Sequence, residues 1–258
     1  MEVISQLQGA TLLPFMLVFA RVSGLFALAP IFSSRLIPNR VKLLVALAVS
    51  MAAMPLAGGT AVPADVGVLA TLVLKEIVIG VAMAFTVSIV FSAISFAGGL
   101  IDLTVGFSFA NVLDPLQNTQ ISIIGQFYSL AATAVFLAIG GHVLLLGAFV
   151  RSFEILPLDR MPNFPDLTMS VLQAASGLFA IGLQIAAPII VTLLVTDVAV
   201  GFLARVAPSM NIFGIELPAK VAAMFALLLV TAPFLVTAFS TRMHDALASV
   251  LDVLAKGS

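Results

Sequence analysis

The stretch IVIGVAMAFTVSIVFSAISFAGGLI, residues 77–101, runs for 25 residues without a charged side chain. A helix needs about 20 apolar residues to cross a bilayer, and a charge at the bilayer centre costs about 2.5–3.5 kcal/mol on insertion scales. The whole chain has the same character, because 62% of its residues are hydrophobic and only 9% are charged. Soluble domains carry about 25% charged residues. We therefore expect helices that lie in lipid or in a large apolar assembly.

Five further runs of low charge set the expected number of helices. They cover residues 12–32, 43–56, 121–150, 167–196 and 221–241. Pro188 and Pro233 lie inside the last two runs, and proline bends a helix. We predict an all-α membrane protein of about six long, bent apolar helices, arranged as three hairpins in a single domain that covers residues 1–258.

The C-terminal residues 242–256 have a different pattern. Apolar residues recur at the spacing of one helical face: Met243, Leu247, Val250, Leu251 and Leu254. The opposite face carries polar residues: His244, Asp245, Ser249, Asp252 and Lys256. We predict an amphipathic C-terminal helix that docks on a surface and does not span the bilayer.

Composition excludes several classes of function. The net charge of -1 provides no basic field, so nucleic acid is not an expected partner. The absence of cysteine excludes disulfides, thiolate metal sites and cysteine nucleophiles. The N-terminus MEVISQLQGA lacks the pattern of a cleaved signal peptide. No phosphate loop, metal motif or catalytic constellation is found, so we expect neither a cofactor nor an enzyme.

The charged loops give no orientation. If six spans alternate, five Lys and Arg residues fall on each side, whereas a cytoplasmic excess is the rule. One side has Arg35, Arg40, Lys42, Arg205 and Lys220, and the other has Lys75, Arg151, Arg160, Arg242 and Lys256. Trp is absent and Tyr occurs once, so the usual interfacial aromatic belt is missing too. The helices are therefore not all expected to be conventional crossings.

The segment GFSFANVLDPLQNTQ, residues 106–120, separates two of the longest apolar runs. Asp114 followed by Pro115, with Gln117 three residues after the aspartate, is typical of a helix start with a capping box. The loop itself is therefore expected to cover residues 106–113.

Several polar residues fall inside or beside the apolar runs. Arg21 lies within the run 12–32. Its charge must be satisfied by a carboxylate, by snorkelling to the membrane surface or by a water-filled cavity. Lys75 and Glu76 are adjacent, so their side chains leave a helix about 100° apart and are not expected to pair. We interpret both as charges flanking a span, with pairing of Glu76 to another chain as the alternative. His142 is expected to make a polar contact with a neighbouring helix.

Two other functions would use such residues. An intramembrane protease would combine His142 with Ser108, although the G-x-S-x-G pattern is absent. A proton-coupled transporter would use Asp102, Asp197 and a helix broken near Pro188.

Two further patterns concern helix ends and contacts. Arg205 followed by Pro208 predicts the end of a helix, and Asn211, Gly214 and Pro218 predict a connection after it. Small residues four apart predict close helix contacts: Gly80 with Ala84, and Ser95 with Gly99.

Five segments, in order along nearly the whole chain, resemble the FliR family of flagellar biosynthesis proteins. They are RVSGLFALAPIFSSRLIPNRVKLLVALA (21–48), KEIVIGVAMAF (75–85), AGGLIDLTVGFSFANVLDP (97–115), FLAIGGHVLLLGAFVRSFEILP (136–157) and DVAVGFLARVAPSMNIFGIELPAKV (197–221). The resemblance implies a subunit of the type III export gate that forms a channel with FliP-like and FliQ-like subunits. An FlhB-like subunit packs against that channel, and exported flagellar proteins pass through it.

The resemblance also implies roles for particular residues and a location. The loop after the third helix would plug the pore, with these residues: Gly106, Phe107, Ser108, Phe109, Ala110, Asn111, Leu113, Asp114 and Pro115. A second set would form subunit contacts or structural joints: Arg21, Glu76, Asp102, His142, Arg205, Pro208, Asn211 and Phe213. The location would be the inner membrane, in contact with lipid, at the flagellar basal body. The equivalent subunit of a virulence injectisome is the closest alternative.

Overall fold

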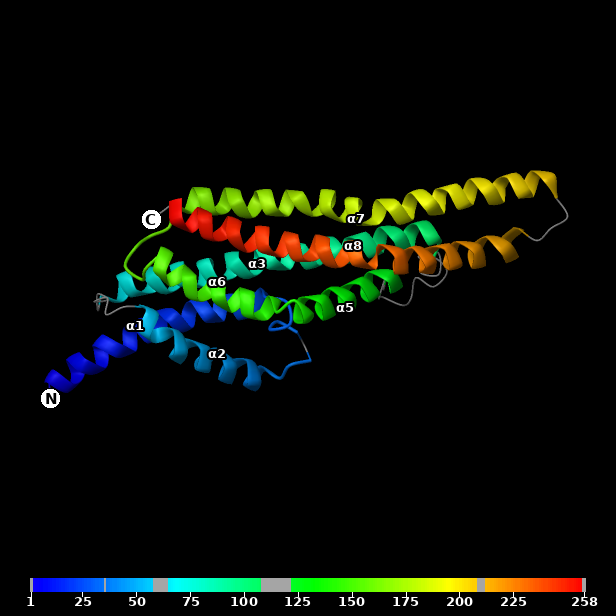
Figure 1. Cartoon of the computed structure of the whole chain (residues 1–258). Coiled ribbons are helices and arrows are strands. Elements are labelled where there is room, and N and C mark those ends of the chain that lie inside the picture. The colour runs from blue at the N-terminus through cyan, green and yellow to red at the C-terminus, as the bar shows by residue number, and fades with distance from the viewer. Residues whose placement is uncertain (1, 35, 58–64, 108–121, 208–211, 257–258) are drawn as a thin grey trace. The chain divides into compact units, whose positions relative to one another are not determined.

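The computed structural model describes residues 2–34, 36–57, 65–107, 122–207 and 212–256, without the side chains of residues 2–11, 212 and 213. Every regular element in these ranges is a helix (Figure 1). The helices are α1 (Glu2–Leu28), α2 (Asn39–Ala53), the short 3-10 helix η1 (Met54–Ala57), α3 (Val66–Val105), α5 (Ile123–Ala138), α6 (Gly141–Ile155), α7 (Phe164–Val206) and α8 (Ile212–Lys256). The all-α prediction is confirmed.

Four of the described helical segments are long and apolar enough to cross a membrane. They are Asn39–Leu56, Val66–Val105, Phe164–Val206 and Gly214–Lys256, and the bent pair α5 and α6 would be a fifth. Leu12–Leu28 is a shorter apolar helix. Each of the six expected runs overlaps a helix or, for 121–150, the bent pair α5 and α6. Helices α3, α7 and α8 are longer than their expected runs, because charged residues expected at the span boundaries lie inside these helices.

Helix α3 shows this difference most clearly. It begins at Val66, where the Asp65 carboxylate accepts a hydrogen bond from the Val68 N–H at 3.0 Å and caps the N-terminus. The helix continues through Lys75 and Glu76, both buried. The expected boundary at these charges was therefore wrong, because each finds a partner of opposite charge within the protein.

The expected single run 121–150 is divided into α5 and α6. Gly140 lies between them with φ +69°, in the left-handed region where glycine has no Cβ penalty. Its N–H donates to the Leu137 carbonyl at 3.2 Å, and its own carbonyl accepts from the Leu144 N–H at 3.0 Å. The same glycine therefore ends one helix and begins the next.

Helices α7 and α8 also run past their expected ends. Figure 1 shows α7 bending near its middle, and Pro188 lies in that part of the helix. Gly214 and Pro218 were expected in a connection, but both lie inside α8, which begins at Ile212. The amphipathic C-terminal segment is not a separate helix, because α8 continues through it to Lys256. Four of its five predicted apolar residues are buried: Met243, Leu247, Val250 and Leu254.

The chain divides into two compact units. The first contains Met1–Val90, Phe136–Ala175 and Arg242–Ser258, and the second contains Phe91–Val135 and Ser176–Thr241. In the second unit, the C-terminal part of α3 is the central element. Its Phe91 packs edge-to-face on Phe239 of α8, and its Phe96 packs in the same way on Phe179 of α7. The core of this unit is therefore built around one apolar helix.

Candidate functional site

A buried ion pair joins α1 to α3 in the first unit. The Arg21 guanidinium donates through Nε to a carboxylate oxygen of Glu76, and both side chains are fully buried. Its other nitrogens donate to the Ser152 hydroxyl at 2.9 Å and to the Leu156 carbonyl at 3.1 Å. The guanidinium also lies 4.0 Å from the centre of the Phe153 ring, a cation–π contact. The carboxylate expected for Arg21 is thus Glu76 of the same chain.

Lys75 completes this cluster. Its Nζ lies 2.8 Å from the second Glu76 oxygen, and it donates to the carbonyls of Leu158 at 2.7 Å and Arg160 at 3.0 Å. The expectation that Lys75 and Glu76 do not pair was therefore wrong. Adjacent residues leave a helix in different directions, but the flexible four-carbon stem of lysine lets its ammonium reach back to the neighbouring carboxylate.

Two glycines allow the helices that carry these charges to approach closely. A Cβ on Gly24 would lie 2.4 Å from the Ile77 carbonyl oxygen of α3, and one on Gly80 would lie 2.1 Å from the Arg21 carbonyl oxygen of α1. Neither approach is possible for a residue with a side chain, since real Cβ atoms essentially never come within 3.0 Å. The small residue predicted at Gly80 is thus a helix contact, and it brings Arg21 within reach of Glu76.

The cluster holds the connection between α6 and α7 against α1 and α3. The carbonyls of Leu156, Leu158 and Arg160 all accept from its two cations. Sequence reasoning singled out the charged residues and missed these acceptors, because carbonyl partners leave no mark in a sequence. Ser152, a polar residue in an apolar helix, was the one available signal. The arrangement is suited to a structural joint, since each charged group is engaged by the protein itself.

A second charged cluster lies in the other unit, between α7 and α8. Lys220 Nζ is 2.6 Å from an Asp197 carboxylate oxygen and 3.1 Å from Glu216, four residues earlier on the same helix. The lysine side chain is 11% exposed, and the two carboxylates are about one third exposed. Lys220 and Glu216 were not predicted as partners of Asp197, although all three fall in the segment 197–221 that was singled out.

Asp102 lies near the end of α3 and is buried. Its carboxylate accepts a long hydrogen bond from the Ile124 backbone N–H in the first turn of α5, with 3.4 Å between the nitrogen and Oδ1. This bond joins the two helices. The Asp102 carbonyl accepts from the Gly106 N–H at 3.1 Å. Asp102 therefore fixes the two helix ends on either side of the proposed plug segment.

Only the first two proposed plug residues are described. Gly106 has φ +101° and ends α3 in a conformation that residues with a Cβ avoid. Phe107 follows in a turn and is half-buried. The remaining plug residues lie outside the described residues: Ser108, Phe109, Ala110, Asn111, Leu113, Asp114 and Pro115. The capping prediction for Asp114 and the Ser108 alternative lie there as well.

The remaining predicted residues are scattered. His142 lies in the first turn of α6, and its Nδ1 is buried without a hydrogen-bond partner among the described residues, so the polar contact expected for it is not seen at this atom. Arg205 is exposed in the last turn of α7, where a cation is favourable to the helix dipole. Pro208 and Asn211 lie outside the described residues, and Phe213 lies in α8.

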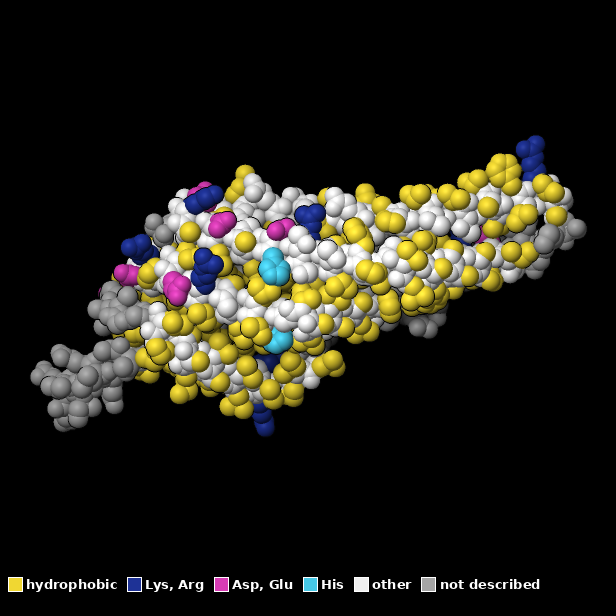
Figure 2. Space-filling model, viewed as in Figure 1, with side chains coloured by type: hydrophobic (Ala, Val, Ile, Leu, Met, Phe, Trp, Pro, Cys, Tyr) yellow, Lys and Arg dark blue, Asp and Glu magenta, His cyan; other side chains and the backbone are white. Residues whose placement is uncertain are grey.

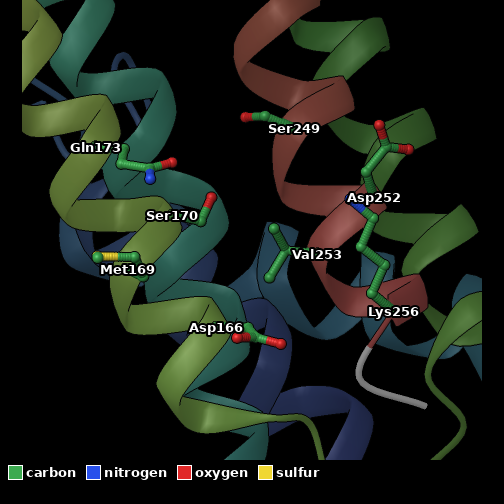
Figure 3. A pocket seen from close by; sticks show the side chains of 8 residues that line it. All are labelled: Asp166, Met169, Ser170, Gln173, Ser249, Asp252, Val253 and Lys256. Atoms are coloured by element: carbon green, nitrogen blue, oxygen red, sulfur yellow. The ribbon is translucent and has the colours of Figure 1, made fainter.

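Two hollows are open to small molecules or side chains. A polar pocket of about 440 Å³ lies in the first unit, where Asp166, Ser170 and Gln173 of α7 face Ser249, Asp252 and Lys256 of α8 (Figure 3). An apolar cavity of about 300 Å³ lies in the second unit and is lined by Tyr128, Phe225, Leu229 and Leu235, among others. Within the described residues, no group of three or more His, Cys, Asp or Glu side chains could hold a metal ion.

These features define an all-helical membrane protein with exceptionally long apolar helices and internally paired charges. Residues 12–246 match the family described as bacterial export proteins, family 1. The flagellar biosynthetic protein FliR of Escherichia coli is 33% identical over 238 residues, which cover 91% of each chain. That of Bacillus subtilis is 34% identical over 221 residues, covering 84% of this chain and 85% of its own. That of Caulobacter vibrioides is 28% identical over 233 residues, covering 90% and 93%. The chain belongs to the FliR family of bacterial export proteins.

Proposed function

We propose that this chain is a structural, non-enzymatic subunit of the flagellar type III export gate in the bacterial inner membrane. Membership of the FliR family makes it a component of flagellar protein export, and the proposal adds its assembly. It forms the export channel with FliP-like and FliQ-like subunits, with an FlhB-like subunit packed against them. The observation that carries the proposal is the family match, which spans residues 12–246 and so includes both charged clusters and the plug segment.

The exposed surface of α7 and α8 supports a role in an assembly. In the second unit, Leu229 is 79% exposed and Val230 is 74% exposed, and Phe179 and Phe202 are exposed as well. Such a surface is unstable in water and must be covered by lipid or by apolar helices of other subunits. Soluble monomers rarely expose apolar areas of this kind.

The pairing of the acids favours this function over proton-coupled transport. A transporter of that kind needs an acid that binds and releases protons on the transport path. Asp197 pairs with Lys220, and Asp102 joins two helix ends. Both acids are therefore engaged in contacts between helices in the resting protein. Such structural contacts suit a gate subunit, whereas a proton carrier needs an acid that is free to bind and release protons.

Co-purification tests the assembly. The tagged chain, co-expressed with the other subunits of the export apparatus and extracted in mild detergent, is expected to elute with two other small hydrophobic subunits. Deleting its gene is expected to abolish motility, and restoring it is expected to recover motility. Loss of effector delivery with normal motility would identify the injectisome equivalent, and solute transport by the purified chain alone would contradict a gate role.

The plug has a separate test. Deleting residues 107–113 is expected to leave the complex assembled but permeable to ions, because the apolar side chains that seal the pore are lost. A length-preserving variant, Phe107→Ser with Phe109→Ser and Leu113→Ser, is expected to leak less. Deleting residues 58–64, which precede α3 and are equal in number, serves as the control. Unchanged membrane permeability in cells that form the complex would rule out the plug assignment.

A further inference from the structure

Helix α2 packs against the protein through its small residues and exposes its large ones. Its buried residues are Ala46, Ser50 and Ala53, spaced along one helical face. The Ser50 hydroxyl is satisfied within the helix, since it donates to the Ala46 carbonyl at 2.7 Å. Large apolar side chains cover the rest of its surface, with Val41, Leu44 and Met51 opposite the buried face: Val41, Leu43, Leu44, Val45 and Met51 are between 40% and 68% exposed. In water the reverse arrangement is favoured, since burial of apolar area drives folding. In lipid, small residues form helix contacts and large ones face the tails.

Two cationic residues lie in the first turn of α2, beside this apolar surface. Arg40 is exposed and Lys42 is half-buried. Neither forms an ion pair with any described residue. The sequence contains no acidic residue between Glu2 and Asp65, so no carboxylate lies near them along the chain. Figure 2 shows Lys or Arg side chains beside hydrophobic ones in the region where Figure 1 places α2.

The position of these cations is unfavourable within the helix itself. Backbone dipoles place a partial positive charge at a helix N-terminus, where acids are stabilising and cations are not. The first turn of α2 has no acidic residue. An external negative charge would offset both the cations and the dipole. The surface is therefore complementary to an anion that adjoins an apolar phase.

We propose that the outer face of α2 binds anionic phospholipid, with Arg40 and Lys42 on the phosphate headgroups and Val41, Leu44 and Met51 against the acyl chains. The apolar segment Asn39–Leu56 is 18 residues long. At 1.5 Å per residue this is about 27 Å, close to the hydrocarbon thickness of about 30 Å. Such a helix places its basic end at one headgroup layer, where cations are attracted to an anionic surface. A protein subunit would need a carboxylate-bearing partner surface to satisfy the same two cations.

A single tryptophan tests this proposal, because the chain contains none. Leu44→Trp replaces a side chain that is 65% exposed on the outer face. The full chain is reconstituted into vesicles of unlabelled phosphatidylcholine that contain increasing fractions of brominated phosphatidylglycerol or brominated phosphatidylcholine. Both brominated lipids are expected to quench the fluorescence, and the anionic lipid is expected to do so at a several-fold lower fraction. This preference is expected to weaken as salt is raised.

Charge variants identify the source of the preference. Arg40→Gln with Lys42→Gln, in the Leu44→Trp background, is expected to equalise the two lipids. Arg151→Gln with Arg160→Gln removes the same charge from two exposed arginines that have acids nearby, Glu154 and Asp159. This control is expected to retain the preference. Circular dichroism confirms that each variant is folded.

Three results would overturn the proposal. Absence of quenching would place Leu44 away from lipid. Equal quenching by the two lipids in the Leu44→Trp protein that retains Arg40 and Lys42 would show that α2 contacts lipid without any preference for anionic headgroups. Loss of quenching when the chain is co-assembled with export-gate subunits would show that α2 is a protein interface. Failure to form any such complex would contradict the proposed function, and the measurement on the full chain would still decide the lipid proposal.

Discussion

At the residue scale, the cluster of Arg21, Lys75 and Glu76 places two positive charges and one negative charge in a buried site. Burying a charge is costly unless it is paired and hydrogen-bonded. Here Glu76 compensates both cations, and the remaining donors are directed at Ser152 and backbone carbonyls. Glu76 is therefore the residue on which the other two charges depend.

This dependence predicts an order of stabilities. Glu76→Gln leaves two buried cations uncompensated, so we expect a loss of about 3–5 kcal/mol in the free energy of unfolding. Arg21→Gln and Lys75→Gln each leave one ion pair intact, so we expect smaller losses. Denaturant titration of the three variants in detergent measures the order. A Glu76→Gln protein no less stable than the other two would contradict the central role of Glu76.

At the element scale, close packing depends on which glycine faces a neighbouring helix. A Cβ on Gly98 of α3 would lie 2.7 Å from the Gly125 Cα and the Ile124 carbonyl oxygen of α5. A Cβ on Gly99 would meet nothing within 4 Å. Of the small-residue pair expected for contact, Ser95 does face α5, since a Cβ on Gly125 would lie 3.2 Å from its carbonyl oxygen, but Gly99 meets no other helix among the described residues. Gly98 makes that contact instead.

These two neighbours provide a matched pair of substitutions. Gly98→Ala is expected to destabilise the protein by about 1–3 kcal/mol, because α5 must move away. Gly99→Ala is expected to stabilise it by about 0.5–1 kcal/mol, because alanine has the higher helix propensity. Thermal unfolding in detergent distinguishes them. If Gly99→Ala preserves the isolated chain but prevents co-purification with other subunits, Gly99 faces a partner helix.

At the scale of the whole molecule, the helices are too long for the bilayer. The helices α3, α7 and α8 have 40, 43 and 45 residues. At 1.5 Å per residue they are about 60–68 Å long, twice the hydrocarbon thickness of about 30 Å. Part of each helix must therefore lie outside the hydrocarbon region. In α8 the C-terminal segment that carries Ser249 and Asp252 is the polar part.

Cysteine labelling tests this division, and the chain has no cysteine of its own. Ser249→Cys and Asp252→Cys are expected to react with a water-soluble maleimide in open membrane fragments. Leu229→Cys and Val230→Cys are expected to be protected, although both positions are highly exposed in the chain itself. Detergent-denatured samples give the full extent of labelling. Rapid reaction at residue 229 would show that this part of α8 faces water.

Much of the fold could be predicted from the sequence because apolar runs of this length have few alternatives. The long helices and the apolar face of residues 242–256 both follow from local composition. Helix boundaries failed where charges were assumed to lie outside spans. Lys75, Glu76 and Lys220 lie inside helices because partners distant in sequence neutralise them.

The sequence alone determined that this is an all-helical membrane protein of the FliR type, because hydrophobicity and family motifs are written in the order of residues. Only the tertiary structure decided that Arg21 binds Glu76, 55 residues away, and that Lys220 binds Asp197. It also decided that, among the described residues, Gly98 and not Gly99 packs against a neighbouring helix. The physical reason is that a charge or a glycine is compatible with several environments. The helix that packs against it selects one of them.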